Sequence, residues 1–438
     1  MPHPIRPPGG RCLVAGWILV LSPAMAIPTV GEERPSVRGT ATPAHRQDSP
    51  RPPDGAASTA VLGWQGPGTP VVWSLDRRIG DPAISYVDPE VASATGLVAW
   101  QDDLGHIWVC QLDRQTGDLI PPDGRGQYLA QGVPLFSSSN SGDNVFRVIN
   151  GPEWGFSQRG AGVYFLFGDN ALRYQIGRVQ LNDLTFEAVT PPSTQAALGA
   201  FPSEDVRDPV GRVLYSRLVE PPDQAAGRIA SEWIEEDRPR AAAAFPLDSI
   251  GSVGPRWIPG QRAIVTNVAD GDGVRQIARH DIDTGETTLL TTGPEPKADA
   301  VFFAAPEFPG ELVFSCIVAE TEIAFYRQVG PGWQEIGRVA APQGPLAAAP
   351  PSVSSAEPFV YRGRSLVVYV ATDRDDSTRI CIGSLDGTIN ARISRSSPLR
   401  QVDPEVVVFD ERLFVHYWTS PDETGVNQLH LCQVRLVP

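Results

Sequence analysis

The sequence contains few of the residue types from which metal and nucleophile sites are usually built. It has 6 histidines, 5 cysteines and a single lysine, Lys297, among its 438 residues. The cysteines form no CxxC pair, and their spacing fits no zinc site. A serine nucleophile elbow, an HExxH motif and a phosphate-binding glycine loop are also absent. We therefore expect no metal centre and no cofactor, with a structural calcium ion at an aspartate-rich turn as the open alternative.

Long apolar runs are missing as well, and none is long enough to span a bilayer. The most apolar N-terminal stretch, residues 12–21, follows Arg6 and Arg11 and precedes a small-x-small cleavage site at positions 24–26. That order is typical of a secretory signal peptide, so we expect a periplasmic or secreted protein. The next stretch is rich in Pro, Ser, Thr and Arg and is predicted to be a disordered linker. The expected division is a signal peptide at 1–26, a linker at 27–66 and a folded domain at 67–438.

Positive charge is scarce relative to negative charge. Lysine and arginine together number 36 against 51 aspartates and glutamates, a formal net charge of −15. An acidic protein is repelled by nucleic-acid phosphates and by anionic membrane surfaces. The composition therefore argues against nucleic acid as a partner. We expect a glycan or a protein partner instead, and no membrane span.

What the sequence does contain is a short phrase that returns seven times. Its first residue is small or acidic, its second is usually a proline, its third varies and its fourth is apolar. A turn and an apolar run follow. Its copies begin at Asp88, Gly151, Ser203, Gly254, Asp299, Pro350 and Asp403. Self-similarity with a period near 50 residues indicates radial or solenoid repetition.

Each phrase is followed by further short runs of β-branched and aromatic residues, bounded by Gly, Asp and Pro, as is typical of antiparallel strands. Four-stranded units at this period are typical of β-propeller blades. The seventh unit lacks a fourth strand, whereas residues 69–75 form a strand-like run before the first phrase. Pairing the two would cover an exposed edge. We therefore predict an all-β fold, a seven-bladed β-propeller of four-stranded antiparallel blades that is closed by an N-terminal strand.

Two copies of the phrase resemble a known repeat. The segments 151–165 and 254–265, with their Gly-Pro-Glu-Trp and Gly-Pro-Arg-Trp starts, are similar to the repeats of TolB-like (WD40-like, PD40-type) β-propellers. The resemblance implies a propeller, usually in bacterial exported proteins. It implies no reaction, because this fold carries scaffolds, glycan binders, lyases and glycosidases.

The third position of the phrase differs between the units in a patterned way. In a propeller this position lies on the innermost strand, near the channel mouth. Aligned by phrase, blades one, two, three and seven have an acid, blade four has an arginine, and blades five and six have Val301 and Ser352. The candidate ligand-binding residues at this position and beside it are Glu90, Glu153, Trp154, Asp205, Arg256, Trp257 and Glu405.

These residues allow a functional and a packing interpretation. Carboxylates accept hydrogen bonds from sugar hydroxyls and tryptophans stack on sugar faces, which suits a polyhydroxyl ligand or a cation. The alternative is that the glutamates pair with neighbouring blades and the tryptophans fill space between blades. A polar insertion at residues 136–150 adds Arg147 and Asn150 as candidate ligand contacts, because long insertions in repeat folds often bind ligands.

We therefore expect an exported propeller that binds a glycan or a protein partner at its axial mouth. The alternative is a carbohydrate-active enzyme, either a polysaccharide lyase or a glycosidase, that uses axial carboxylates such as Glu90 and Glu153. No catalytic residue can be assigned from the sequence.

Overall fold

In the computed structural model, every regular element of the described residues is a β-strand. The described residues run from 71 to 437 except for 104, 121–132, 137–146, 169–173, 194–196, 209, 219–228, 236–244, 248–254, 343–349 and 422–423. The predicted signal peptide and linker lie outside this set. Among the described residues there is no helix of the length and hydropathy that crossing a lipid bilayer requires.

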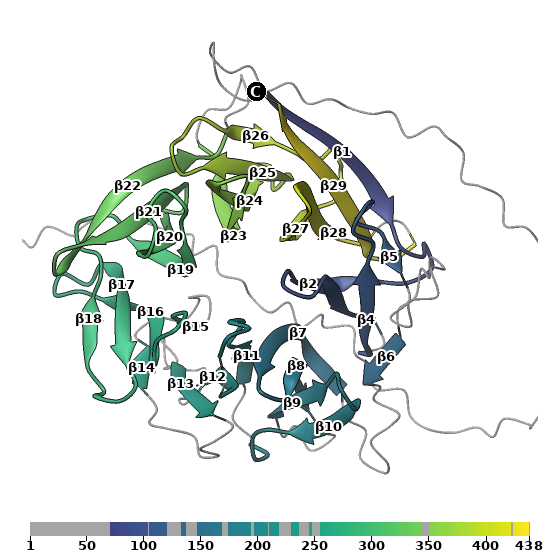
Figure 1. The fold of residues 1–438 in the computed structure, drawn as a ribbon, viewed down its shortest axis with the longest axis horizontal. Coiled ribbons are helices and arrows are strands. Elements are labelled where there is room, and N and C mark those ends of the chain that lie inside the picture. The colour runs from purple at the N-terminus through teal and green to yellow at the C-terminus, as the bar shows by residue number, and fades with distance from the viewer. Residues whose placement is uncertain are drawn as a thin grey trace, which may run out of the picture. The chain divides into compact units, whose positions relative to one another are not determined.

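Seven antiparallel sheets surround a common centre, as Figure 1 shows, which confirms the predicted seven-bladed β-propeller. Six sheets have four strands, and the sheet of blade one has in addition a short strand, β6 (Val133–Phe136), which pairs with β4. In blades one to six the strands follow chain order from the centre outward. In blade seven the outer strand is β1, which precedes all the others in the chain.

The strands fall into four concentric sets, each ordered from blade one to blade seven. The innermost strands are β2 (Val87–Ala92), β7 (Arg147–Ser157), β11 (Ala197–Pro202), β15 (Arg256–Trp257), β19 (Lys297–Ala304), β23 (Ser352–Tyr361) and β27 (Gln401–Phe409). The second strands are β3 (Leu97–Gln101), β8 (Gly160–Gly168), β12 (Arg212–Leu218), β16 (Ala263–Ala269), β20 (Leu312–Val318), β24 (Arg364–Thr372) and β28 (Arg412–Thr419). The third strands are β4 (Ile107–Leu112), β9 (Tyr174–Gln180), β13 (Ile229–Glu235), β17 (Arg275–Asp281), β21 (Glu322–Val329), β25 (Thr378–Ser384) and β29 (Gln428–Val437). The outer strands are β5 (Leu119–Ile120), β10 (Thr185–Ala188), β14 (Phe245–Leu247), β18 (Thr287–Leu289), β22 (Gly332–Ala340), β26 (Asn390–Arg392) and β1 (Val71–Ile79).

The second strands show why the apolar runs of the sequence are continuous rather than alternating. In β24 every residue from 365 to 371 is buried. Successive side chains of a strand point to opposite faces, and in β24 each face packs against a different neighbouring blade. Leu366, Val368 and Val370 join a cluster with blade seven, and Val367, Tyr369 and Ala371 join a cluster with blade five. Burial of one such Val or Leu side chain is worth roughly 1.5–3 kcal/mol, so packing between blades is the main source of stability.

Strand β1 completes the sheet of blade seven. Its nine residues pair antiparallel with β29, from Val71 opposite Val437 to Ile79 opposite Leu429. The Ser74 hydroxyl also donates a hydrogen bond to the Ile393 carbonyl of blade six at 2.6 Å. Residues at the two ends of the described chain are therefore neighbours in one sheet.

Asp76 is the buried polar anchor of β1. Its Oδ2 accepts hydrogen bonds from the Tyr417 hydroxyl at 2.8 Å and from the Arg395 backbone N–H at 2.6 Å. His430 Nδ1 lies 3.4 Å from Oδ1, and the Asp76 side chain is only 5% exposed. Burial raises the pKa of Asp76, but the interactions with His430, Arg395 and Tyr417 outweigh it and hold the pKa below its ordinary value. One carboxylate thus connects β1 to β28, β29 and the segment that follows β26.

Replacing Asp76 with alanine is expected to lower the free energy of unfolding at pH 7 by about 1–3 kcal/mol. The Tyr417 hydroxyl would stay buried without an acceptor, which is the costly case, and the exposed Arg395 N–H would lose its protein partner. Denaturant titration of the purified domain measures the change. Asp272→Ala, at an exposed hairpin tip, is the matched control and should stay within about 0.5 kcal/mol of the parent. Equal effects of the two substitutions would contradict a role for Asp76 in anchoring β1.

Candidate functional site

A β-bulge in the innermost strands determines which side chains reach the axis. The register against the second strand shifts in six of the seven blades. In four of them the bulge contains a residue with positive φ, namely Asp88 (54°), Asp299 (56°), Ser355 (46°) and Asp403 (55°). Aspartate adopts this conformation more readily than most residues, and a bulge bends the strand and redirects the side chains beyond it.

The residue directly after the bulge is a glutamate in four blades. These glutamates are Glu357 of blade six, Glu405 of blade seven, Glu90 of blade one and Glu153 of blade two. Blade four places Arg256 at this level, and blade five places Val301 there. The four glutamates therefore form one acidic arc of consecutive blades.

The phrase alignment made from the sequence is wrong in two blades. In blade six the predicted position was Ser352, but the register shifts between Ser354 and Glu357, so that Glu357 occupies it. In blade three, β11 ends at Pro202, and Ala200 follows the bulge. Asp205, predicted for this position, lies in the turn after the strand instead. The acidic arc is displaced by one blade from its predicted place.

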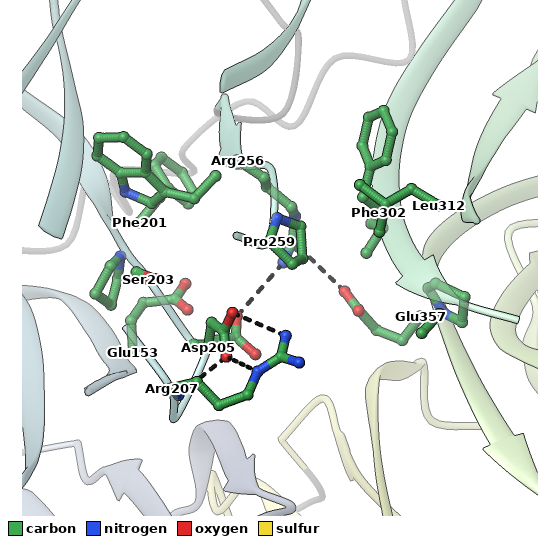
Figure 2. Close-up of a pocket in the computed structure, with 16 residues that line it drawn as sticks. Glu153, Phe201, Ser203, Asp205, Arg207, Arg256, Pro259, Phe302, Leu312 and Glu357 are labelled. Carbon is green, nitrogen blue, oxygen red and sulfur yellow. Dashed lines mark hydrogen bonds and ion pairs between the residues drawn. The ribbon is translucent and has the colours of Figure 1, made fainter. Parts of the chain in front are cut away.

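A cavity of about 390 Å³ lies beside this arc and reaches from blade two to blade six (Figure 2). Its charged lining residues are Glu153, Glu204, Asp205, Arg207, Arg256 and Glu357, and its larger apolar ones include Phe201, Trp257, Pro259, Phe302 and Pro358. Because Glu153 and Glu357 come from blades on opposite sides of blade four, the cavity lies across the centre of the ring. Glu153, Asp205 and Arg256 were candidates from the sequence, whereas Glu204, Arg207 and Glu357 were missed.

Arg256 is the central cation of the cavity. Its Nη2 donates a hydrogen bond to Glu357 Oε1 at 3.0 Å, and its Nη1 lies 3.9 Å from Glu204 Oε1. In Figure 2 its guanidinium group lies between Glu357 on one side and Glu153 on the other. The carboxylate of Glu357, followed by those of Glu204 and Glu153, raises the pKa of Arg256. Donors and acceptors are thus held in fixed positions in one cavity.

The carboxyl groups of the arc are crowded. Burial raises the pKa of Glu90, and the charges of Glu405, Glu153, Asp403 and Asp88 raise it further. The pKa of Glu405 is raised by burial, and then by Glu357 and Asp403. Both residues are half-buried. A group in this situation favours its neutral form, which both donates and accepts a hydrogen bond.

Glu153, like Glu357, lies beside the cation Arg256, whereas neither Glu90 nor Glu405 lines the cavity around that arginine. Burial raises its pKa, Arg256 opposes this effect, and Glu204, Asp403 and Glu357 add to it, so that the pKa lies well above its ordinary value. Glu153 and Glu357 are thus the two members of the arc that also line the cavity around Arg256.

Three acids between blades one and seven lie especially close together. Asp88, Glu90 and Asp403 each place one carboxylate oxygen within 4.8 Å of the other two. Burial raises the pKa of Asp88 to about 6 against the effect of hydrogen bonds from Asp403 and Gly151. Oxygen ligands of this kind suit a hard cation such as calcium. Asp88 and Asp403 are the first residues of their phrases, whereas the candidates from the sequence lie at the third position and beside it.

The two candidate tryptophans have different surroundings. Trp154 is 2% exposed, packs between blades one and two, and donates from Nε1 to the Glu90 carbonyl at 2.9 Å. This is the inter-blade packing that the sequence left as an alternative. Trp257 lines the cavity, with the Arg212 guanidinium 5.6 Å above its ring. Only Trp257 is therefore placed to contact a ligand in the cavity.

The predicted contacts from the polar insertion are only partly described. Arg147 and Asn150 belong to β7, where they pair with Gly168 and Leu166 of β8. The positions of their side chains, and residues 137–146 of the insertion, lie outside what the structure describes. Their role as ligand contacts remains a prediction.

The chain matches no family model and no curated protein sequence. It is similar to solved structures of other propellers. An oligogalacturonate lyase in complex with manganese has 12% identity and a TM-score of 0.52, over 85% of this chain and 95% of that one. Oligogalacturonate lyase from Vibrio parahaemolyticus has 11% identity and a TM-score of 0.52, over 85% and 96%. TolB from Acinetobacter baumannii has 10% identity and a TM-score of 0.35, over 69% and 84%. At these identities the likeness concerns the fold, and the TolB-like family is not established for this chain.

Asp299→Asn is expected to stabilise the protein at alkaline pH. Burial raises the pKa of Asp299 to about 6, although Arg256 opposes the effect. The folded state thus binds the proton more tightly than the unfolded state, and the charged form costs stability. This cost is absent below about pH 4 and complete above about pH 6. We expect a gain of about 1–3 kcal/mol at pH 8 that disappears at pH 4.

Denaturant titration at the two pH values measures this difference. Asparagine keeps the shape of the side chain and tolerates the positive φ of 56° at this position. Asp376→Asn, at an exposed turn with a φ of 63°, is the control for the backbone conformation. A gain of the same size at both pH values would show that the charge of Asp299 is not its cause.

Proposed function

We propose that the chain is an exported binding module that holds a neutral glycan in the axial cavity. The main support is the fixed arrangement of Arg256 between carboxylates, which offers hydrogen-bond donors and acceptors within one cavity. Sugar hydroxyls both donate and accept, so a site of this composition satisfies both of their functions. The flat faces of Trp257, Phe201 and the prolines supply the apolar part that ligand pockets share.

The charge around the cavity favours a neutral glycan over an acidic one. Four acidic side chains line the cavity against two guanidinium groups, those of Arg207 and Arg256; the acids are Glu153, Glu204, Asp205 and Glu357. A polyanion would meet repulsion that is strong in a region of low dielectric constant. A basic segment of a protein partner is the other ligand that this charge admits. The guanidinium groups of Arg256 and Arg207 in the same cavity count against it.

A carbohydrate-active enzyme is the second candidate, and one observation favours it. Glu90 and Glu153 have raised pKa values, and the charge of Glu153 contributes to the shift of Glu90; a raised pKa is what a carboxylic acid needs to donate a proton near neutral pH. Paired carboxyl groups perform this chemistry in glycosidases. The lyases among the similar structures act in the same broad substrate class, but their 11–12% identity adds no residue to this argument.

A binding screen with a product assay separates these possibilities. The purified mature domain is applied to arrayed neutral glycans, uronate-containing glycans and basic peptides, and each bound glycan is then tested for new reducing ends and for ultraviolet absorbance. Binding of neutral glycans without product supports the binding module. Product formation would instead establish the enzyme, and binding of the peptides alone would overturn the glycan proposal.

Glu153→Gln and Glu357→Gln are each expected to weaken binding of the selected glycan at least tenfold. Either change replaces a carboxyl oxygen beside Arg256 with an amide nitrogen, so that a hydrogen bond to the ligand or to the guanidinium group is lost, and a hydrogen bond to a charged group is worth about 1.5–3 kcal/mol. Titration calorimetry gives the affinities. Glu286→Gln, at an exposed position of the hairpin β17–β18, is the control and should bind as the parent does. Unchanged affinity in both cavity variants would place the glycan elsewhere.

A further inference from the structure

A second cavity adjoins the axial cavity. It has a volume of about 350 Å³ and lies between blades three and four, where the turns that follow β11 and β15 face each other. Ser203, Asp205, Arg207 and Trp257 line both cavities, so the two share a wall. The residues that line only the second cavity include Asp208, Arg212, Gly260, Gln261 and Arg262. The site therefore extends outward from the axis along one boundary between blades.

Three guanidinium groups in this wall are held in place by carboxylates, and two of them share an anchor. Arg212 donates from Nε to Glu235 at 2.9 Å and from Nη1 to Asp208 at 2.6 Å. The same Glu235 holds Nη1 of Arg262, whose Nε bonds Asp283 at 2.9 Å. The side chains of Asp208 and Glu235 are 3% and 4% exposed, so the anchors are rigid.

Arg207 is held in the same way at the boundary between the two cavities. It donates from Nε and Nη2 to the two oxygens of Asp205, at 2.9 and 3.0 Å, while its side chain is 79% exposed. In all three arginines one terminal nitrogen has no hydrogen-bond partner within the described part of the chain. Three oriented donors are therefore left for a ligand. Such preorganisation lowers the entropy that binding costs.

The charged groups in this region leave no excess of positive charge, which narrows the kind of ligand. The three guanidinium groups face four carboxylates, those of Asp205, Asp208, Glu235 and Asp283. No net positive charge is available among these described residues to select a phosphate or a carboxylate. Donors remain, and the carboxylates keep lone pairs that can accept hydrogen bonds. This combination suits hydroxyl groups, which carry no charge and form both types of hydrogen bond.

We propose that the axial and inter-blade cavities together bind a neutral oligosaccharide, with one or more sugar units in each cavity. The proposal rests on the function proposed above and goes further, because it makes the ligand a chain rather than a single sugar. Trp257 and the Asp205–Arg207 pair contact the linkage region between the two subsites. Gly260 and Gln261 belong to the outer subsite alone.

The experiment compares ligand lengths in variants of the outer subsite. The probes are cello-, xylo- and manno-oligosaccharides of one to six units, with galacturonate oligomers as the charged series. Gly260→Asn places a side chain in the outer cavity. A Cβ at this position meets no atom within 4 Å, and asparagine tolerates the φ of +70°. Gly273→Asn is the control, with a φ of +77°, equally open space and no part in either cavity.

In the parent and in Gly273→Asn, the affinity of at least one neutral series should rise tenfold or more from one unit to several. In Gly260→Asn that rise should disappear, while the affinity for the single sugar stays unchanged. Gln261→Trp, which adds bulk to the same wall, should reproduce this result, and the thermal midpoints of all variants confirm folding.

Three other outcomes would overturn the proposal. If a sugar binds with an affinity that does not depend on length, the outer subsite is wrong and the axial binding function stands. If the galacturonate oligomers bind best, the assignment of a neutral ligand is wrong. If none of the probes binds, the proposed function and this extension of it both fall.

Discussion

The bulge in the innermost strands is the constraint on which the rest of the site depends. A regular antiparallel strand would direct alternate side chains into the packing between blades. The extra residue of the bulge resets that alternation just before the glutamates of four blades. As a result, residues that a regular strand would have buried beside Leu and Val reach the axis. The positive φ at Asp88, Asp299 and Asp403 shows that the same local geometry recurs around the ring.

Bringing the carboxyl groups of several blades together at the axis costs electrostatic free energy, and the packing between blades offsets this cost. Like charges at short distance in a partly desolvated region raise one another's pKa values, as they do for Glu90, Glu405 and Asp403. The second strands bury both of their faces, and this apolar burial exceeds what a few strained carboxyl groups remove. The propeller can therefore hold an acidic centre because its stability arises elsewhere, between the blades.

The blades could be predicted from the sequence because hairpin turns require glycine, asparagine or aspartate at fixed places, and these recur with the period of the fold. The site could be predicted only in part. In blades two and four, the third residue of the phrase lies on the innermost strand near the axis, as the sequence predicted. This is why the prediction included Glu153, Arg256 and Trp257. Glu357 was missed because its blade begins the bulge at Ser355 with no proline, so the phrase at Pro350 was matched instead. Asp205 was assigned to a strand that ends three residues earlier, since spacing alone does not distinguish a strand end from a turn.

The two parts of the extended cavity differ in their ratio of acids to cations, and this difference explains how both act on one ligand. At the axis, acids outnumber cations, so that anions are excluded and protonated carboxyl groups can donate. Between blades three and four, every guanidinium group of the described wall is paired with a carboxylate. The guanidinium groups can therefore still donate hydrogen bonds, but no excess of positive charge attracts an anion. A ligand that crosses the shared wall at Trp257 must suit both environments. A charged chain would be repelled in one part and gain nothing in the other, whereas hydroxyl groups find partners in each. The selectivity of such a site comes from what it rejects as much as from the contacts that it makes.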